Sequence, residues 1–179
     1  MKLLTIGALA LTSSITMAAD YQIDPAHSAV VFKVGHLGVS TTVGRFNNFE
    51  GDFTFDKDQT SDSASLTIQA DSIDTNHDAR DKHLRSPDFL DVKQFPTLTF
   101  KSTKFEGDKL TGNLTIHGVT KPVSFDVKKI GEGKDPWGGY RAGFEATTTI
   151  QRSDFGVTYF IPGVTDATEI EVYVEGIRQ

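Results

Sequence analysis

Apolar and polar residues alternate in short runs along most of the chain. In Ala29 to His36, for example, Val30, Phe32 and Val34 fall at every second position. Successive side chains of a strand point to opposite faces, so this period of two predicts strands with one apolar and one polar face. The segments with this pattern are residues 29–36, 65–71, 97–101, 110–117, 123–127, 140–150 and 169–175, and Phe46, Phe49, Phe53 and Phe55 lie in the expected second and third strands. About eight such strands, separated by polar turns, predict an antiparallel all-β domain.

The stretch 74–85 breaks this alternation. It is dense in charge, and its acidic and basic residues lie four apart, at the spacing that supports one face of a helix. Asp74 or Thr75 is placed to cap the N-terminus. Pro87 ends the element, because the residue before a proline is pushed out of the α region. We therefore predict one short helix, from about Asn76 to Arg85.

The alternation alone does not separate a sandwich from a barrel, since both bury one face of each strand. The 13 phenylalanines favour a closed barrel, because only one short helix is available to cover an open sheet. An eight-stranded barrel is either filled by its own side chains or holds one small ligand. The aromatic rows fit both a packed core and an apolar cavity.

The N-terminus has the pattern of a secretory signal peptide. Lys2 gives a basic start, residues 3–11 are apolar, and small residues follow up to Ala18. The small residues Thr16 and Ala18 favour cleavage after Ala18, which leaves residues 19–179 as a single exported domain. Later apolar runs are too short to span a bilayer as a helix.

Composition and motifs exclude several classes of function. The net charge of −6 argues against nucleic-acid binding, and the lack of cysteine removes thiolate chemistry and disulfides. The five histidines are scattered without the spacing of metal ligands, so we predict no metal site. No G-x-S-x-G motif or other convergent catalytic set is evident, so we expect no enzyme.

Two segments outside the strands are candidates for contact with other molecules. The charged helix is typical of a solvated surface, but as a lid it would bring Arg80, Lys82 or Arg85 to an anionic head group. The apolar segment from Tyr159 to Val164 predicts a binding rim. It would form either the mouth of the barrel or a homodimer contact.

Several motifs in one order resemble the YceI family of secreted lipocalin-like proteins, and they cover essentially the whole chain after the signal peptide. They are Tyr21-x-Ile23-Asp24, His27-Ser28, Phe32-x-Val34-x-His36-x-Gly38, Gly44-x-Phe46, Phe49-x-Gly51, Ser72-Ile73-Asp74-Thr75-Asn76, Arg80-Asp81-x-His83-Leu84, Asp88-Phe89-Leu90, Phe95-Pro96, Gly118-Val119-Thr120-Lys121-Pro122-Val123, Asp135-Pro136-Trp137-Gly138-Gly139, Arg141-Ala142-Gly143-Phe144 and Ser153-Asp154-Phe155-Gly156.

The resemblance implies an eight-stranded antiparallel lipocalin-like barrel in the periplasm. It implies a protein that buries a polyisoprenoid, such as a quinone or a polyprenyl phosphate, without chemistry on it and without another cofactor. An accessory protein of a membrane redox or stress-response system, with a packed barrel and transient contact with a membrane complex, is the alternative. Head-group candidates are His36, Arg80 and Arg85. The inward rows supply the candidate cavity residues, which are Phe32, Val34, Phe46, Phe53, Leu66, Ile68, Leu98, Phe100, Leu114, Ile116, Phe125, Phe144 and Val172.

Overall fold

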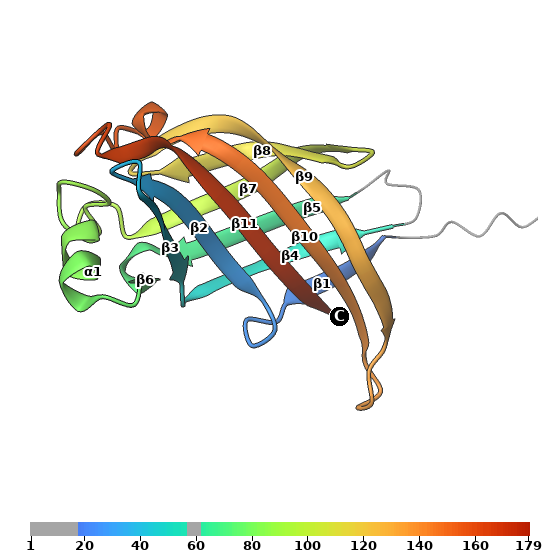
Figure 1. Cartoon of the computed structure of the whole chain (residues 1–179). Coiled ribbons are helices and arrows are strands. Elements are labelled where there is room, and N and C mark those ends of the chain that lie inside the picture. Colours follow the sequence, from blue (N-terminus) through green and yellow to red (C-terminus); the bar gives the residue numbers. More distant parts are fainter. Residues whose placement is uncertain (1–17, 57–61) are drawn as a thin grey trace, which may run out of the picture.

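The alternating segments form β-strands in the computed structural model, which describes residues 18–56 and 62–179 (Figure 1). The predicted signal peptide lies outside the described residues, except for Ala18. The strands are β1 (Ala19–Ile23), β2 (Ala29–His36), β3 (Ser40–Phe46), β4 (Phe49–Phe55), β5 (Ser63–Gln69), β6 (Ile73–Asp74), β7 (Thr97–Glu106), β8 (Lys109–Ile116), β9 (Val119–Lys134), β10 (Tyr140–Gln151) and β11 (Val164–Arg178). The helical elements are α1 (Asp78–Leu84) and the 3₁₀ turns η1 (Ala70–Ser72) and η2 (Arg152–Phe155).

Six of these strands are halves of three longer ones. Both β1 and β2 pair antiparallel with β11, so they run in the same direction and form one strand that is interrupted by a turn. The strands β3 and β4 pair with β2 and β1 in turn and are separated by Asn47 and Asn48 alone. The turn η1 interrupts the third long strand, β5 and β6, which pair with β4 and β3.

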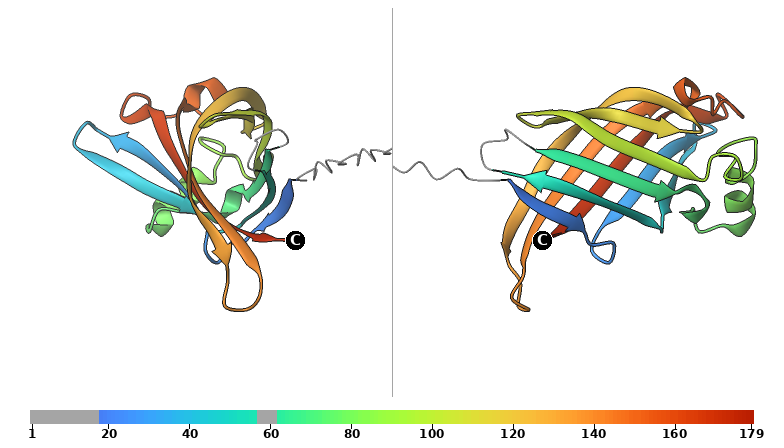
Figure 2. Two further views of the ribbon diagram at one scale, coloured as in Figure 1. Left: turned by 90° about the vertical axis from the view of Figure 1, so that its right-hand side faces the viewer. Right: turned by 180° about the vertical axis from the view of Figure 1, so that it is seen from behind.

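Counted in this way, the described residues form a closed barrel of eight antiparallel strands, which confirms the predicted fold. Each long strand is hydrogen-bonded to the next one along the chain, and β11 closes the ring on β1 and β2. Two further views show the strands wrapping around a common axis (Figure 2). The alternation predicted the first strand at residues 29–36 and did not include β1, which a polar turn separates from β2.

Because the strands run up and down in chain order, successive connections lie at opposite ends of the barrel. One end of the barrel carries the β2–β3 turn, the connection 75–96 with α1, and the loop 156–163 after η2, and we call it the helix end. The other is the hairpin end, which carries the β9–β10 turn and the C-terminus. Figure 1 shows α1 and the C-terminus at opposite ends of the barrel.

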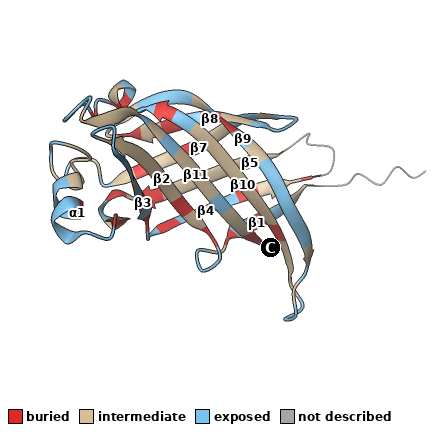
Figure 3. Cartoon of the chain, viewed as in Figure 1, coloured by how far each residue is buried: buried red, intermediate tan, exposed pale blue. Residues whose placement is uncertain are grey.

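Large aromatic side chains point into the barrel where neighbouring strands carry glycine. The Phe32 ring lies over Gly44 on the paired strand, where an added Cβ would come within 2.2 Å of it. The Phe100 ring covers Gly112 in the same way, at 2.4 Å. These glycines are therefore sites of close approach in regular strands. Buried residues are spread along the strands, whereas α1 and the β9–β10 turn are mostly exposed (Figure 3).

The helix begins and ends inside the predicted range. It spans Asp78–Leu84 and is capped by His77, whose Nδ1 accepts a hydrogen bond from the Arg80 backbone N–H at 3.2 Å, so the predicted caps were wrong. Asp81 was expected on a solvated face but is buried. It accepts hydrogen bonds from the Thr75 N–H at 2.9 Å and the Thr75 hydroxyl at 2.5 Å, which anchors the helix to the preceding segment.

No helix among the described residues is long and apolar enough to cross a membrane.

Candidate ligand-binding site

A cavity of about 270 Å³ lies inside the barrel. All eight long strands contribute to its wall, and Leu84, Phe89 and Val157 extend it to the helix end. The wall is almost wholly apolar. Ligand pockets typically have volumes of about 300–1,000 Å³ and a mostly apolar lining. The cavity therefore approaches the size of such a pocket and matches its chemistry.

Side chains on one side of the barrel face empty space. Phe32 on β2, Phe144 on β10 and Val172 on β11 point inwards and line the cavity, yet each remains partly exposed. Ile68 and Leu98, on the strands β5 and β7, line it as well but are buried. A well-packed protein core leaves few voids larger than a water molecule. The cavity is therefore bordered by partly exposed side chains such as Phe32, Phe144 and Val172, and by buried ones such as Ile68 and Leu98.

The thirteen apolar residues predicted from the inward rows all line this cavity. Their contact with a ligand stays a prediction. Sequence reasoning missed the contributions of the two long connections, namely Leu84, Phe89 and Leu90 before β7, and Val157 after η2. These segments have no strand periodicity, so the alternation could not show which of their side chains face inwards.

The three predicted head-group residues lie outside the cavity wall. The Arg80 guanidinium donates to the Thr75 hydroxyl at 2.7 Å and to the Thr75 carbonyl at 2.6 Å. The Arg85 guanidinium donates to the carbonyls of Asp71 and Ile73 at 2.7 and 2.6 Å. Both guanidinium groups thus tie α1 to the barrel. His36 ends β2, where it pairs with Val164. Their contact with a head group stays a prediction.

A different arginine, Arg152, lines the cavity at the helix end. Its buried guanidinium donates to four backbone carbonyls, those of Val157, Tyr159, Val164 and Thr165, at 2.8–3.0 Å. Burial lowers the pKa of this group below its usual value. The side chain thus holds the loop 156–163 against the end of the barrel. The neighbouring motif at Ser153 was noted in the sequence, but nothing in it distinguished a buried arginine from a solvated one.

An ionic cluster stabilises the hairpin end. Arg141 on β10 donates to Asp24, Glu175 and Asp135, with N···O distances of 2.8, 2.5 and 3.1 Å. Its hydrogen bond is the main reason that the pKa of Asp24 falls to about 2, with a second contribution from His27. Asp24, His27 and Glu175 are close enough together to bind a metal ion. The guanidinium of Arg141 already provides the positive charge that faces Asp24 and Glu175.

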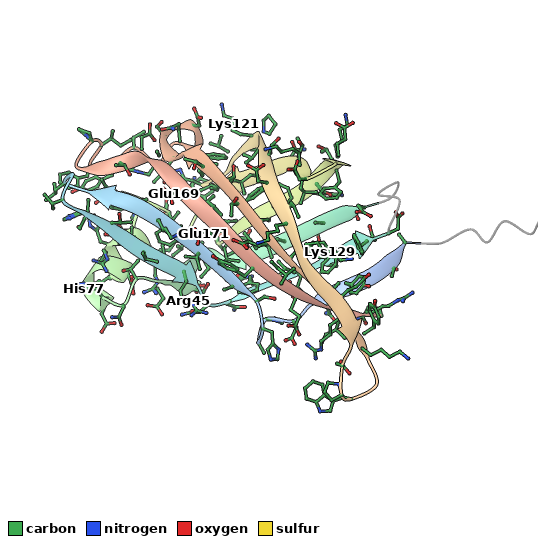
Figure 4. The ribbon with its side chains drawn as sticks, turned by 45° about the vertical axis from the view of Figure 1, so that its right-hand side comes forward. Arg45, His77, Lys121, Lys129, Glu169 and Glu171 are labelled. Atoms are coloured by element: carbon green, nitrogen blue, oxygen red, sulfur yellow. The ribbon has the colours of Figure 1, made fainter. Side chains whose placement is uncertain are left out.

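The outer surface carries alternating charged residues, as the sequence predicted. Glu169 and Glu171 occupy alternate positions along β11 (Figure 4). The ammonium of Lys33, on the neighbouring β2, lies 2.5 Å from Glu171. This pair lowers the pKa of Glu171 and raises that of Lys33, as expected for a pair on the polar face of the sheet.

Curated relatives match nearly the full length of the chain. A UPF0312 protein of Pseudomonas aeruginosa is 50% identical over 183 residues, which cover 98% of this chain and 96% of that protein. Protein YceI of Salmonella paratyphi B is 48% identical over 182 residues, which cover 98% and 95%.

Solved structures share the barrel. BcnA of Burkholderia cenocepacia aligns with a TM-score of 0.77 at 26% identity, over 86% of this chain and 98% of that one. The YCEI protein of Campylobacter jejuni aligns with a TM-score of 0.73 at 27% identity, over 100% and 99%. A polyisoprenoid binding domain from Saccharophagus degradans has the same fold, with a TM-score of 0.67 at 14% identity, over 89% and 98%.

The model of the YceI-like domain matches residues 21–176, from the first strand of the barrel to the last. The chain therefore belongs to the YceI family.

Proposed function

We propose that the protein binds and carries a long apolar lipid of the isoprenoid class, a quinone or a polyprenyl phosphate, in the periplasm. The observation that carries this proposal is the apolar cavity within the closed barrel. The name of the Saccharophagus degradans domain, which has the same fold, agrees with this choice of ligand. The sequence pattern of a signal peptide supports export.

Burial of apolar surface supplies the binding energy. Each methylene group of the ligand that leaves water contributes about 0.8 kcal/mol, less the costs of ordering the chain. We expect affinity to rise with each isoprene unit until the cavity is filled. Units beyond that length remain outside the cavity with the polar head and add little.

The ionisable groups of the wall do not form a catalytic set. Among the described residues, Asp52 and Asp62 line the cavity towards the hairpin end, whereas Arg152 lies at the helix end. General acid–base catalysis requires groups within hydrogen-bonding reach of one reacting atom. We therefore propose binding without chemistry. The alternative of an accessory protein with a packed barrel has less support, because the interior holds a cavity.

Native mass spectrometry tests the proposal. The protein is purified from the periplasm without detergent and sprayed intact, and the bound material is then extracted and identified. We expect a stoichiometric adduct that releases a prenyl lipid, on a chain that begins at Ala19. A bare chain that also fails to take up added prenyl alcohols of 10, 15 and 20 carbons would contradict the proposal.

A further inference from the structure

Two uncharged stretches meet at the helix end of the barrel. Residues 34–44 and 155–165 contain no Asp, Glu, Lys or Arg, in a chain that is 23% charged. The Leu37 backbone N–H donates to the Gly163 carbonyl at 2.7 Å, and His36 pairs with Val164. The turn between β2 and β3 and the loop after η2 therefore form one continuous surface.

This surface exposes bulky apolar side chains. Val39 is 82% exposed, Leu37 56% and Phe160 52%, and Tyr159 and Ile161 beside Phe160 are exposed as well. We call these five residues the apolar tip. Leu37 and Phe160 have positive φ angles of 52° and 58°, an uncommon conformation for bulky residues. Exposed clusters of this kind, held in strained backbone, mark interaction sites.

The apolar tip is continuous with the wall of the cavity. The Tyr159 ring lies 5.2 Å from the ring of Phe89, which lines the cavity, and 6.3 Å from the ring of Phe160. Val34, three residues before Leu37, and Val164, three residues after Ile161, line the cavity too. An apolar molecule at the tip would thus lie next to the apolar interior.

We propose that the apolar tip inserts into the surface of a lipid bilayer and places the cavity beside the membrane. The proposal rests on the proposed function, because isoprenoid lipids reside in membranes. The absence of charged residues favours a bilayer as the partner, because two uncharged segments suit its uncharged interior. Tyr159 suits the boundary between headgroups and acyl chains, where Tyr and Trp are enriched.

Flotation of the mature chain with phosphatidylcholine vesicles tests this docking. We expect wild-type protein to float with the vesicles, with little dependence on salt. Val39→Asp and Phe160→Asp should each weaken the association at least tenfold. The matched control is Ile130→Asp, which changes an exposed isoleucine on β9, towards the hairpin end, and should float like wild type.

The sole tryptophan reports which end touches the membrane. Trp137 is 79% exposed and lies in the β9–β10 turn, at the hairpin end. Its emission should stay unchanged when vesicles are added. A blue shift would place the hairpin end in the membrane and overturn the proposal. So would flotation that survives both tip substitutions, or a dimer in solution that both substitutions dissociate.

The two proposals can fail separately. Binding of a short prenyl alcohol in the absence of vesicles is measured on wild type and on both tip variants. Equal binding by all three, with flotation lost only in the tip variants, supports docking by the tip. If wild type floats through the tip but binds no prenyl alcohol, the proposed function fails and docking stands.

Discussion

A substitution that fills part of the cavity should weaken ligand binding without lowering the stability of the protein. Ala146 on β10 lies opposite Val127 on β9 and Val172 on β11, and all three side chains line the cavity. Replacing it as Ala146→Leu adds three carbon atoms to a wall that faces empty space. A ligand then loses the space of about three methylene groups.

The expected loss follows from the area that the ligand no longer buries. At about 0.8 kcal/mol per methylene, three groups correspond to about 2 kcal/mol, or roughly a 30-fold rise in Kd. The added side chain fills a void, so the free energy of unfolding of the empty protein should stay the same or rise by about 0.5–2 kcal/mol.

Titration of a prenyl alcohol by calorimetry and unfolding in urea measure the two quantities. The control is Thr147→Leu on the same strand, whose partners in the sheet are Glu171 and Asp126 on the outer surface. It should leave Kd unchanged. If Ala146→Leu folds normally and binds the same ligand with unchanged affinity, the ligand does not occupy this cavity.

Further predictions concern stability. Arg141→Met should lower the midpoint of urea unfolding, because it leaves three carboxylates without their shared cation. The pKa of Asp24 is held at about 2, against an ordinary value of 3.8, so the native state binds fewer protons than the unfolded state. Asp24 should therefore stabilise the native state above pH 4, by about 1 kcal/mol because solvent screens a group so near the surface, and lose this contribution as the pH falls towards 2. Thermal unfolding of Asp24→Asn across this range should lack that part of the pH dependence. Asp81→Ala leaves the buried Thr75 N–H and hydroxyl without their acceptor and should cost about 1–3 kcal/mol, whereas Asp78→Ala on the exposed face should cost less than 1 kcal/mol by the same measurement.

The alternation of apolar and polar residues was the main feature from which the fold could be predicted. It identified most of the long strands and their inward faces, because a strand has only two faces and one of them is apolar, but it did not predict β1 or β6. It did not show closure, which depends on the pairing of β11 with β1 and β2, the first strands along the described chain. The alternation of residues within one strand does not show which distant strand it pairs with.

The connections were harder to predict for a different reason. In α1 the spacing of charges predicted a helix. That spacing does not show which of its aspartates is buried, and Asp81 is. Arg152 is buried because backbone carbonyls of an irregular loop converge on it. Such convergence depends on tertiary structure, and local sequence carries no sign of it.

The closure of the ring by β11 has a consequence for the order in which the barrel is made. This strand pairs with β10 on one side and with β1 and β2 on the other, and it is the last strand along the chain. As the chain emerges from N- to C-terminus, the edges of β1, β2 and β10 stay open until residues 164–178 are free. An unpaired edge can pair with another chain. A chain truncated before Val164 should therefore aggregate or be digested by protease, whereas a chain that includes residues 164–178 should resist both.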